Sequence, residues 1–151
     1  MRSSIFAVDV SDLRKRILRA LDDARKESSS RRTTLDEAKT AYAQFLQNVA
    51  VPLLRQAQDV LKAERQVFTV HTPADSARLA SESAPETFVE IGFDASGPKP
   101  HVIGRVSVTR GRQGVVVDEK AIAPDTPIAK LGDAELTEFL VTAIPKLVVK
   151  P

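Results

Sequence analysis

The chain contains no cysteine, no tryptophan and a single tyrosine among its 151 residues. Without cysteine it can form no disulfide, no thiolate metal site and no thiol nucleophile. Because aromatic residues make up only 5% of the sequence, the core must be built mainly from valine, leucine, isoleucine and alanine. Few aromatic side chains also leave few surfaces on which the bases of a single-stranded nucleic acid can stack.

The sequence also lacks the segments and motifs that mark membrane proteins and common enzymes. No apolar run approaches the roughly 20 residues that span a bilayer. The apolar segment near the start of the chain is too short for a signal peptide, and Asp9 follows it directly. No nucleophile elbow, phosphate-binding loop or dinucleotide-binding glycine pattern is present. We therefore expect a cytoplasmic protein without a cofactor, a metal or a membrane contact.

Charged residues are plentiful at 28%, but they nearly balance, which leaves a formal net charge of +2. Residues 1–66 carry thirteen Lys and Arg against nine Asp and Glu, so the basic excess lies in the first half. An excess of this size is far below that of a dedicated nucleic-acid-binding arm. With 42% hydrophobic residues, the chain is typical of one soluble globular domain, residues 1–151.

A helical pattern begins at Ser11, a residue type that suits an N-cap. Apolar residues then recur at helical spacing on one face: Leu13, Ile17, Ala20, Leu21 and Ala24. The polar segment "SSSRR", residues 28–32, interrupts the pattern. A second helix is predicted from Thr34, whose spacing to Glu37 matches a capping box. Two amphipathic helices with a short polar connection predict an antiparallel helical hairpin over residues 1–65.

The second helix is predicted to be long and to be interrupted near Pro52. Its apolar stripe runs from Leu35 to Leu61. Pro52, however, removes one backbone donor and clashes with the preceding turn. We therefore expect a kink or break near Val49–Val51, after which the helix resumes to about Glu64.

Residues 66–123 change from the helical period to the alternation that is typical of strands. Four strands are predicted, in the segments "QVFTVHT", "ETFVEIGFD", "HVIGRVSVT" and "VVVDEKAI". The segment "PADSARLASESAP" between the first two is predicted as a loop with a short turn of helix around Ser76–Ala80. Short polar connections between the strands predict an antiparallel meander.

Residues 124–151 are predicted as a loop and a final helix with Asp133 as its N-cap. The apolar face of this helix consists of Leu136, Phe139, Leu140, Ala143 and Leu147. Because Pro145 weakens the end of the helix, residues 146–150 fit either helix or a short final strand. The whole chain is thus expected to be α+β, with its helices packed on one face of the sheet.

The length of the second helix is the main indication of function. Its apolar stripe is longer than a four-stranded sheet, roughly 20 Å across, needs for cover. Apolar surface that remains must be buried elsewhere, and self-association buries it. We expect the interface at the bulkiest group before the kink: Tyr42, Phe45, Leu46 and Val49. The favoured hypothesis is a non-enzymatic protein-interaction or adaptor module, a homodimer joined through its helices, with or without another protein partner.

The stretch "TRGRQGVVVDEK", residues 109–120, supports a first alternative. Its glycines fit the tip of a hairpin, and its two arginines match the geometry of phosphate groups. Together with other arginines they would form the contact surface of a nucleic-acid-associated protein. The residues assigned to that surface are Arg31, Arg32, Arg105, Arg110 and Arg112.

A second alternative concerns Asp118 and Lys120, which lie two residues apart on a strand and therefore share a face. With Glu90 or Asp94 they would resemble the acidic and basic groups of a metal-dependent nuclease or hydrolase. Only one carboxylate stands at a fixed spacing to the lysine, so we expect a polar strand and no catalytic pair. The two histidines lack a third ligand at a defined spacing, and we expect no metal site there.

Overall fold

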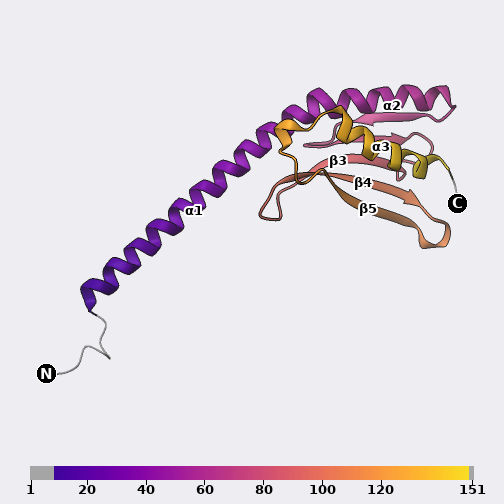
Figure 1. Ribbon diagram of the computed structural model, residues 1–151. Helices are drawn as coiled ribbons and strands as arrows, with labels where there is room; N and C mark the ends of the chain where they lie inside the picture. The colour runs from indigo at the N-terminus through magenta and orange to yellow at the C-terminus, as the bar shows by residue number, and fades with distance from the viewer. Residues whose placement is uncertain (1–8, 150–151) are drawn as a thin grey trace. The chain divides into compact units, whose positions relative to one another are not determined.

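The computed structural model describes residues 9–149 and shows an α+β fold (Figure 1), which confirms the predicted class. In chain order, two helices precede a five-stranded antiparallel sheet and a third helix follows it. The chain divides into two compact units, residues 1–37 and residues 38–151, and the second contains the sheet. Within the described range, none of the helices combines the length and apolar content that crossing a bilayer requires.

Helix α1 runs from Val10 to Phe45 without interruption, so the predicted antiparallel hairpin with its break at residues 28–32 is wrong. The helix contains no glycine or proline that would end it. The hydroxyl group of Thr33 donates a hydrogen bond to the carbonyl oxygen of Ser29 (3.1 Å), and Thr34 repeats this bond one residue further on (3.0 Å). The polar side chains are therefore satisfied on the preceding helical turn instead of breaking the helix.

The start of α1 is capped by Asp9 and not by Ser11 as predicted. The Ser11 N–H donates a hydrogen bond to Oδ1 of Asp9 at 3.1 Å. A carboxylate at this position also interacts favourably with the positive end of the helix dipole, which a serine hydroxyl group does not. The helix therefore begins one residue before the predicted cap, at Val10.

A π-helical turn, Leu46–Ala50, joins α1 to helix α2, Val51–Ala63. Pro52 is one of the first residues of α2. Because proline has no N–H to donate to the preceding turn, α-helical bonding is interrupted just before it. The α-helical pattern thus changes next to the predicted Val49–Val51, but as a π-helical turn with helical backbone angles and not as a break. Helix α2 then continues almost as far as predicted.

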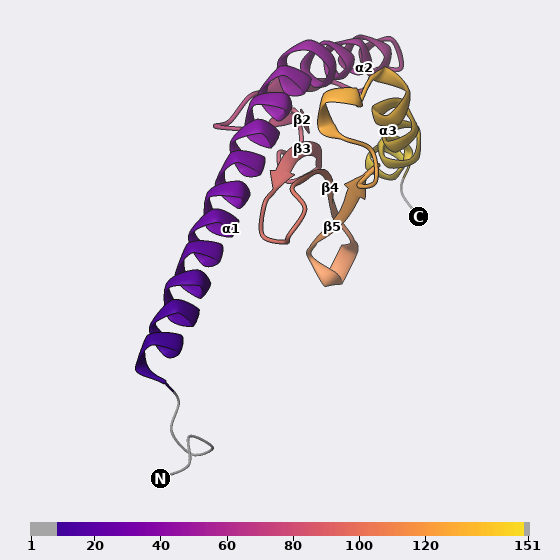
Figure 2. The ribbon, with the colours of Figure 1, turned by 60° about the vertical axis from the view of Figure 1, so that its left-hand side comes forward.

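The sheet consists of five antiparallel strands that follow one another in chain order (Figure 2): β1 Phe68–His71, β2 Ala77–Ser81, β3 Phe88–Asp94, β4 His101–Thr109 and β5 Val115–Ile122. Strand β2 lies in the segment predicted as a loop with a helical turn, so that prediction and the count of four strands are wrong. Its alanines and serine have low strand propensity, but Ala77 and Leu79 pair with residues of β3. Pairing with neighbouring strands thus overrides weak local preference.

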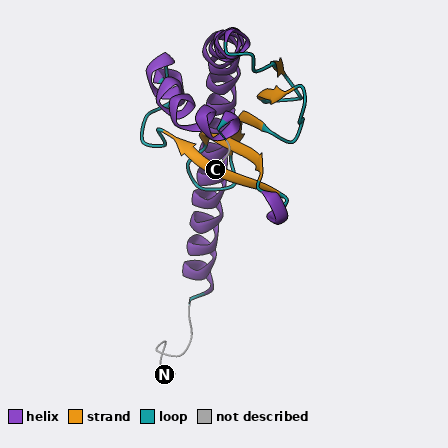
Figure 3. Cartoon of the chain, turned by 90° about the vertical axis from the view of Figure 1, so that its right-hand side faces the viewer, coloured by secondary structure: helices purple, strands orange, loops and turns teal. Residues whose placement is uncertain are grey.

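Strands β4 and β5 form the hairpin that was predicted from "RGRQG". Its tip is a 3-10 turn, η2, over Gly111–Gln113 (Figure 3). Gly111 and Gly114 have φ angles of 50° and 73°. Glycine adopts such angles without the steric cost that other residues meet, so the two glycines account for the position of the reversal.

Helix α3 is Asp133–Val148. Its N-cap is Gly132 and not the first helical residue as predicted, and the Gly132 N–H donates a hydrogen bond to the Glu135 carboxylate at 3.1 Å. Pro145 lies inside α3, and the helix continues past it to Val148 although proline has no N–H to donate. Residues 146–150 were predicted as either helix or strand, and the structure shows helix as far as Val148, the end of α3. Residue 150 lies outside the described range.

Helices α2 and α3 cover one face of the sheet, with α2 against β1 and β2 and α3 against β3, β4 and β5 (Figure 1). The core between them is largely aliphatic, as predicted, and its fully buried side chains include Leu54, Leu79, Val89, Ile91, Val102 and Leu136. Gly104 of β4 lies directly beneath Phe139 of α3. A Cβ atom at position 104 would lie 2.2 Å from the phenyl ring, so the close approach of α3 requires glycine there.

Candidate functional site

The exposed apolar face of α1 is the first candidate surface. Val10, Leu13, Ile17 and Leu21 form a row at helical spacing, which we name the α1 stripe. Their side chains are 79%, 47%, 49% and 44% exposed, in that order. Along the whole of α1, burial is confined to two residues near its carboxyl end. Within the first unit, this row of apolar side chains is therefore exposed.

Two basic residues flank this stripe. The segment Val10–Arg19 contains four cations and one carboxylate, but Lys15 and Arg19 lie on the opposite face of the helix. Helical spacing places Arg14 and Arg16 on the two sides of the stripe. Arg16 pairs with Asp12 at 3.1 Å, but both side chains are largely exposed, so the pair stabilises the helix only weakly. An apolar partner surface with negative charge at its border would complement this segment.

A second apolar surface lies within residues 38–151, between α2 and α3. This α2–α3 groove has a volume of about 430 Å³, and the apolar side chains that line it include Leu53, Ala57, Val60, Leu140, Val141 and Ile144. Val60 and Val141 remain 65% and 60% exposed. Large exposed apolar side chains on two neighbouring helices are typical of protein–protein interaction surfaces.

The charges next to the groove are acidic. Helix α3 contains three carboxylates and one lysine, and helical spacing places Asp133 and Glu138 beside the groove and Lys146 on the far side. On α2 the same spacing places Arg55 and Lys62 on the side away from the groove. Arg55 indeed lines a different hollow. The groove and the α1 stripe thus carry border charges of opposite sign.

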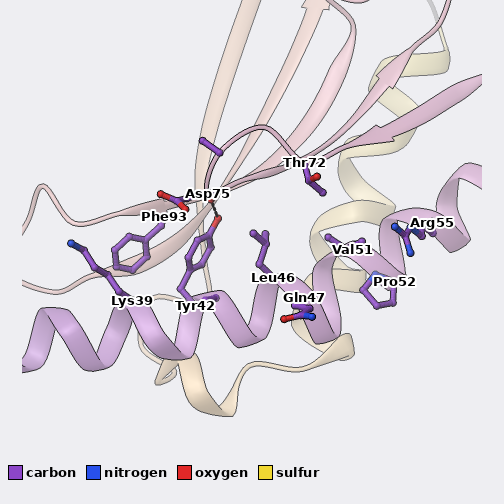
Figure 4. Close-up of a pocket in the computed structure, with 12 residues that line it drawn as sticks. Lys39, Tyr42, Leu46, Gln47, Val51, Pro52, Arg55, Thr72, Asp75 and Phe93 are labelled. Atoms are coloured by element: carbon purple, nitrogen blue, oxygen red, sulfur yellow. Dashed lines mark hydrogen bonds between the residues drawn. The ribbon is translucent and has the colours of Figure 1, made fainter.

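That different hollow is a third feature, with a volume of about 770 Å³, and it lies beside the π-helical turn (Figure 4). Leu46 and Val51 contribute to its apolar wall, while Lys39 and Arg55 lie at its opposite ends. Such a lining suits an apolar molecule with one negative charge. The two cations are sixteen residues apart along the helices, about 24 Å at helical rise. A small ligand would therefore contact only one of them.

Tyr42 ties the end of α1 to the loop that borders this hollow (Figure 4). Its hydroxyl group donates a hydrogen bond to the carbonyl oxygen of Asp75, and its ring stacks on Phe93 with centroids 5.0 Å apart. Burial, followed by the negative charges of Asp75 and Glu90, raises the pKa of Tyr42 above its ordinary value. Tyr42 therefore keeps its proton at neutral pH and acts as a hydrogen-bond donor, not as a general base.

A row of four charged side chains crosses the opposite face of the sheet, because neighbours of Gly104 in β4 point away from α3. Arg78, Glu90, Arg105 and Glu119 lie directly opposite one another on β2, β3, β4 and β5. The Glu90 carboxylate accepts hydrogen bonds from Arg78 at 2.9 Å and from Arg105 at 3.1 Å. Arg105 also donates to Glu119 at 2.6 Å. Glu90 is 6% exposed, so these bonds compensate a charge that burial would otherwise destabilise.

The residues predicted as the interface lie within residues 38–151. Tyr42 and Phe45 are each 4% exposed and belong to the core, and Leu46 and Val49 pack against it while partly buried. A single chain already covers most of this group. The larger apolar side chains that stay exposed include those of the α1 stripe and of the α2–α3 groove.

The five arginines of the nucleic-acid alternative fall into three places. Arg31 and Arg32 are exposed residues of α1, and Arg110 and Arg112 are exposed at the tip of the β4–β5 hairpin. Arg105 is held by two carboxylates, and its hydrogen bonds to Glu119 and Glu90 raise its pKa against the effect of burial. Its guanidinium group is thus bound within the sheet. Of the five arginines, the hairpin tip therefore offers two, Arg110 and Arg112, that could contact a phosphate.

The residues of the nuclease alternative are not gathered at one point. Asp118 and Lys120 pair with residues 106 and 104 of β4 and therefore share the face of Gly104. Glu90 and Asp94 belong to the opposite face, in register with Arg105 and His101. Within residues 9–149, no group of three or more histidines and carboxylates has an arrangement that could hold a metal ion.

The α2–α3 groove and the charged row were not predicted from the sequence. Val141 and Ile144 are available signals for the groove, because both are apolar and both lie outside the apolar face predicted for the last helix. The charged row depended on the pairing of β2 with β3, and β2 was predicted as a loop. Comparison with protein-family models, with curated proteins and with solved structures finds no match for this chain.

Proposed function

We propose that this protein is a non-enzymatic interaction module that self-associates, and that the α1 stripe joins one copy to another. The observation that carries the proposal is the exposure of the four stripe side chains, between 44% and 79%. Helices in water are only marginally stable by local propensity and depend on the packing of an apolar face. A second copy that covers the stripe supplies this packing.

The size of the stripe is consistent with reversible association. Fully burying a leucine or isoleucine side chain contributes about 1.5–3 kcal/mol, so covering a side chain that is half exposed contributes roughly 1 kcal/mol. Four such residues on each of two copies contribute about 8 kcal/mol, against an association cost of about 4–15 kcal/mol. Stripe residues alone thus support a weak complex, and a tight one needs further apolar surface.

The test is the oligomeric state of a variant in which Ile17→Glu and Leu21→Glu place two charges in the stripe. We expect light scattering and sedimentation at micromolar concentration to report a dimer for the native chain and a monomer for the variant. Both side chains are about half exposed, so circular dichroism should show that the fold is kept. Ser29→Glu, at an exposed position of α1 outside the stripe, is the matched control and should leave the dimer intact. A native chain that is strictly monomeric contradicts the proposal.

A further inference from the structure

We propose that the α1 stripe of one copy docks into the α2–α3 groove of a second copy, so that association is an exchange of helices and not a pairing of like stripes. This inference rests on the proposed function. It adds which surface of the second copy the stripe contacts. The groove is apolar and exposed, and its border is acidic, whereas the stripe is apolar and exposed with a basic border.

The groove can hold most of the stripe. The stripe extends from Val10 to Leu21, eleven residue steps or about 16 Å at helical rise, and its Leu13–Leu21 part makes eight steps, about 12 Å. The lining of the groove also makes eight steps along each helix, from Leu53 to Leu61 on α2 and from Thr137 to Pro145 on α3. An amphipathic helix that lays anchors at such spacing into an apolar groove is a recurrent mode of recognition.

Charge favours the groove over a second stripe. Two stripes that pair side by side in the same direction bring together Arg14 and Arg16 of both copies, the cations that flank the stripe. Like charges at the border of an interface oppose association. Docking in the groove instead brings Arg14 and Arg16 near Asp133 and Glu138. Docking in the groove also buries Val60 and Val141, whose apolar area adds to that of the stripe residues.

Because the chain has no cysteine, single cysteines can report the contact directly. Ile17→Cys and Val141→Cys are prepared separately, mixed in equal amounts and exposed to mild oxidant. We expect a disulfide-linked product that contains one chain of each variant. Ser29→Cys mixed with Val141→Cys is the matched control and should give at most background linkage.

A second measurement uses two charged variants. One carries Ile17→Glu with Leu21→Glu, and the other carries Val60→Glu with Val141→Glu. We expect each alone to associate at least about tenfold more weakly than the native chain, as for central interface residues. Mixed, they should form a heterodimer, because one retains its groove and the other its stripe. Ala63→Glu with Thr142→Glu, exposed positions that do not line the groove, should leave the native dimer unchanged.

The possible outcomes separate the two proposals. If Ile17→Cys links efficiently to itself and the mixture gives no mixed product, stripes pair with stripes, and this inference fails while the proposed function stands. The same holds if Val60→Glu with Val141→Glu associates like the native chain. If the native chain does not associate, both fail. Mixed linkage together with a restored heterodimer supports both.

Discussion

Residues 10–37 and residues 38–149 both contain amphipathic helices, but the apolar faces of these helices have different surroundings in the two regions. In the first, the ion pairs Asp12–Arg16 and Asp22–Lys26, each at 3.1 Å, lie in solvent, and the apolar row beside them is exposed. In the second, α2 and α3 place their apolar residues against five strands. Hydrogen bonds between neighbours in sequence are sufficient to specify a helix, whereas the removal of its apolar face from water requires another element. For the first region we infer that this element belongs to a second chain.

The same substitution in the two regions should give the largest contrast. Leu54→Ala removes a fully buried side chain and should lower the free energy of unfolding by about 3 kcal/mol or more. Leu13→Ala changes a half-exposed residue at a position where alanine also favours helix. It should change the free energy of unfolding by about 0.5 kcal/mol or less. Urea unfolding at low protein concentration, where association is absent, measures both. Equal losses would show that α1 residues are part of the same core.

Carboxylates of the two regions should differ next. Glu90→Gln leaves two arginines without their shared buried partner, and we expect a loss of about 2 kcal/mol. This is below the roughly 3–5 kcal/mol of fully buried pairs, because both arginine side chains are about one-third exposed. Asp12→Asn breaks a pair that lies in solvent and should cost less than about 0.5 kcal/mol. Urea unfolding of both variants decides the matter, and an indistinguishable pair of values would remove the structural role assigned to the charged row.

A smaller effect is expected from Tyr42 at alkaline pH. The folded chain raises the pKa of this phenol. Below about pH 10 the folded and the unfolded chain both keep the proton, so the contribution of Tyr42 to the free energy of unfolding is fully present. At higher pH the unfolded chain loses the proton first, and stability falls by up to about 1.4 kcal/mol per pH unit. Tyr42 is the single tyrosine, so its phenolate absorbance reports this group alone. Unfolding free energies of the native chain and Tyr42→Phe should diverge in slope above pH 10, and parallel profiles would refute the assignment.

The smallest effect is expected at the hairpin tip. Arg110→Ala combined with Arg112→Ala changes two exposed side chains. The free energy of unfolding, measured by thermal denaturation, should change by no more than about 0.5 kcal/mol. At about 50 mM salt, where phosphate contacts are strongest, we expect no binding of DNA or RNA in a fluorescence titration. Binding that weakens steeply with salt, and that the double variant loses for unrelated sequences alike, would instead support the nucleic-acid alternative.

Local pattern was sufficient for much of the fold. The helical period from Leu13 to Ala24 predicted the start of α1, the proline at position 52 predicted an interruption, and alternation predicted β1, β3, β4 and β5. The prediction of a break at residues 28–32 failed because serine and threonine can bond to their own helix as readily as they end it. Periodicity alone carries no information about which of these two happens.

Identification of the exposed surfaces needed the tertiary structure. Amphipathic helices, a largely aliphatic core and a basic first segment could all be predicted, because these features follow from residue type and spacing. The sequence by itself did not determine which apolar rows would be used inside the chain. Tyr42 and Phe45 are buried and Leu13 and Ile17 are not, although all four lie on apolar helical rows. Burial depends on what packs against a row: Tyr42 is covered because the strand pairing places beside it Phe93 of β3, on which its ring stacks, and the loop at Asp75, to which it bonds.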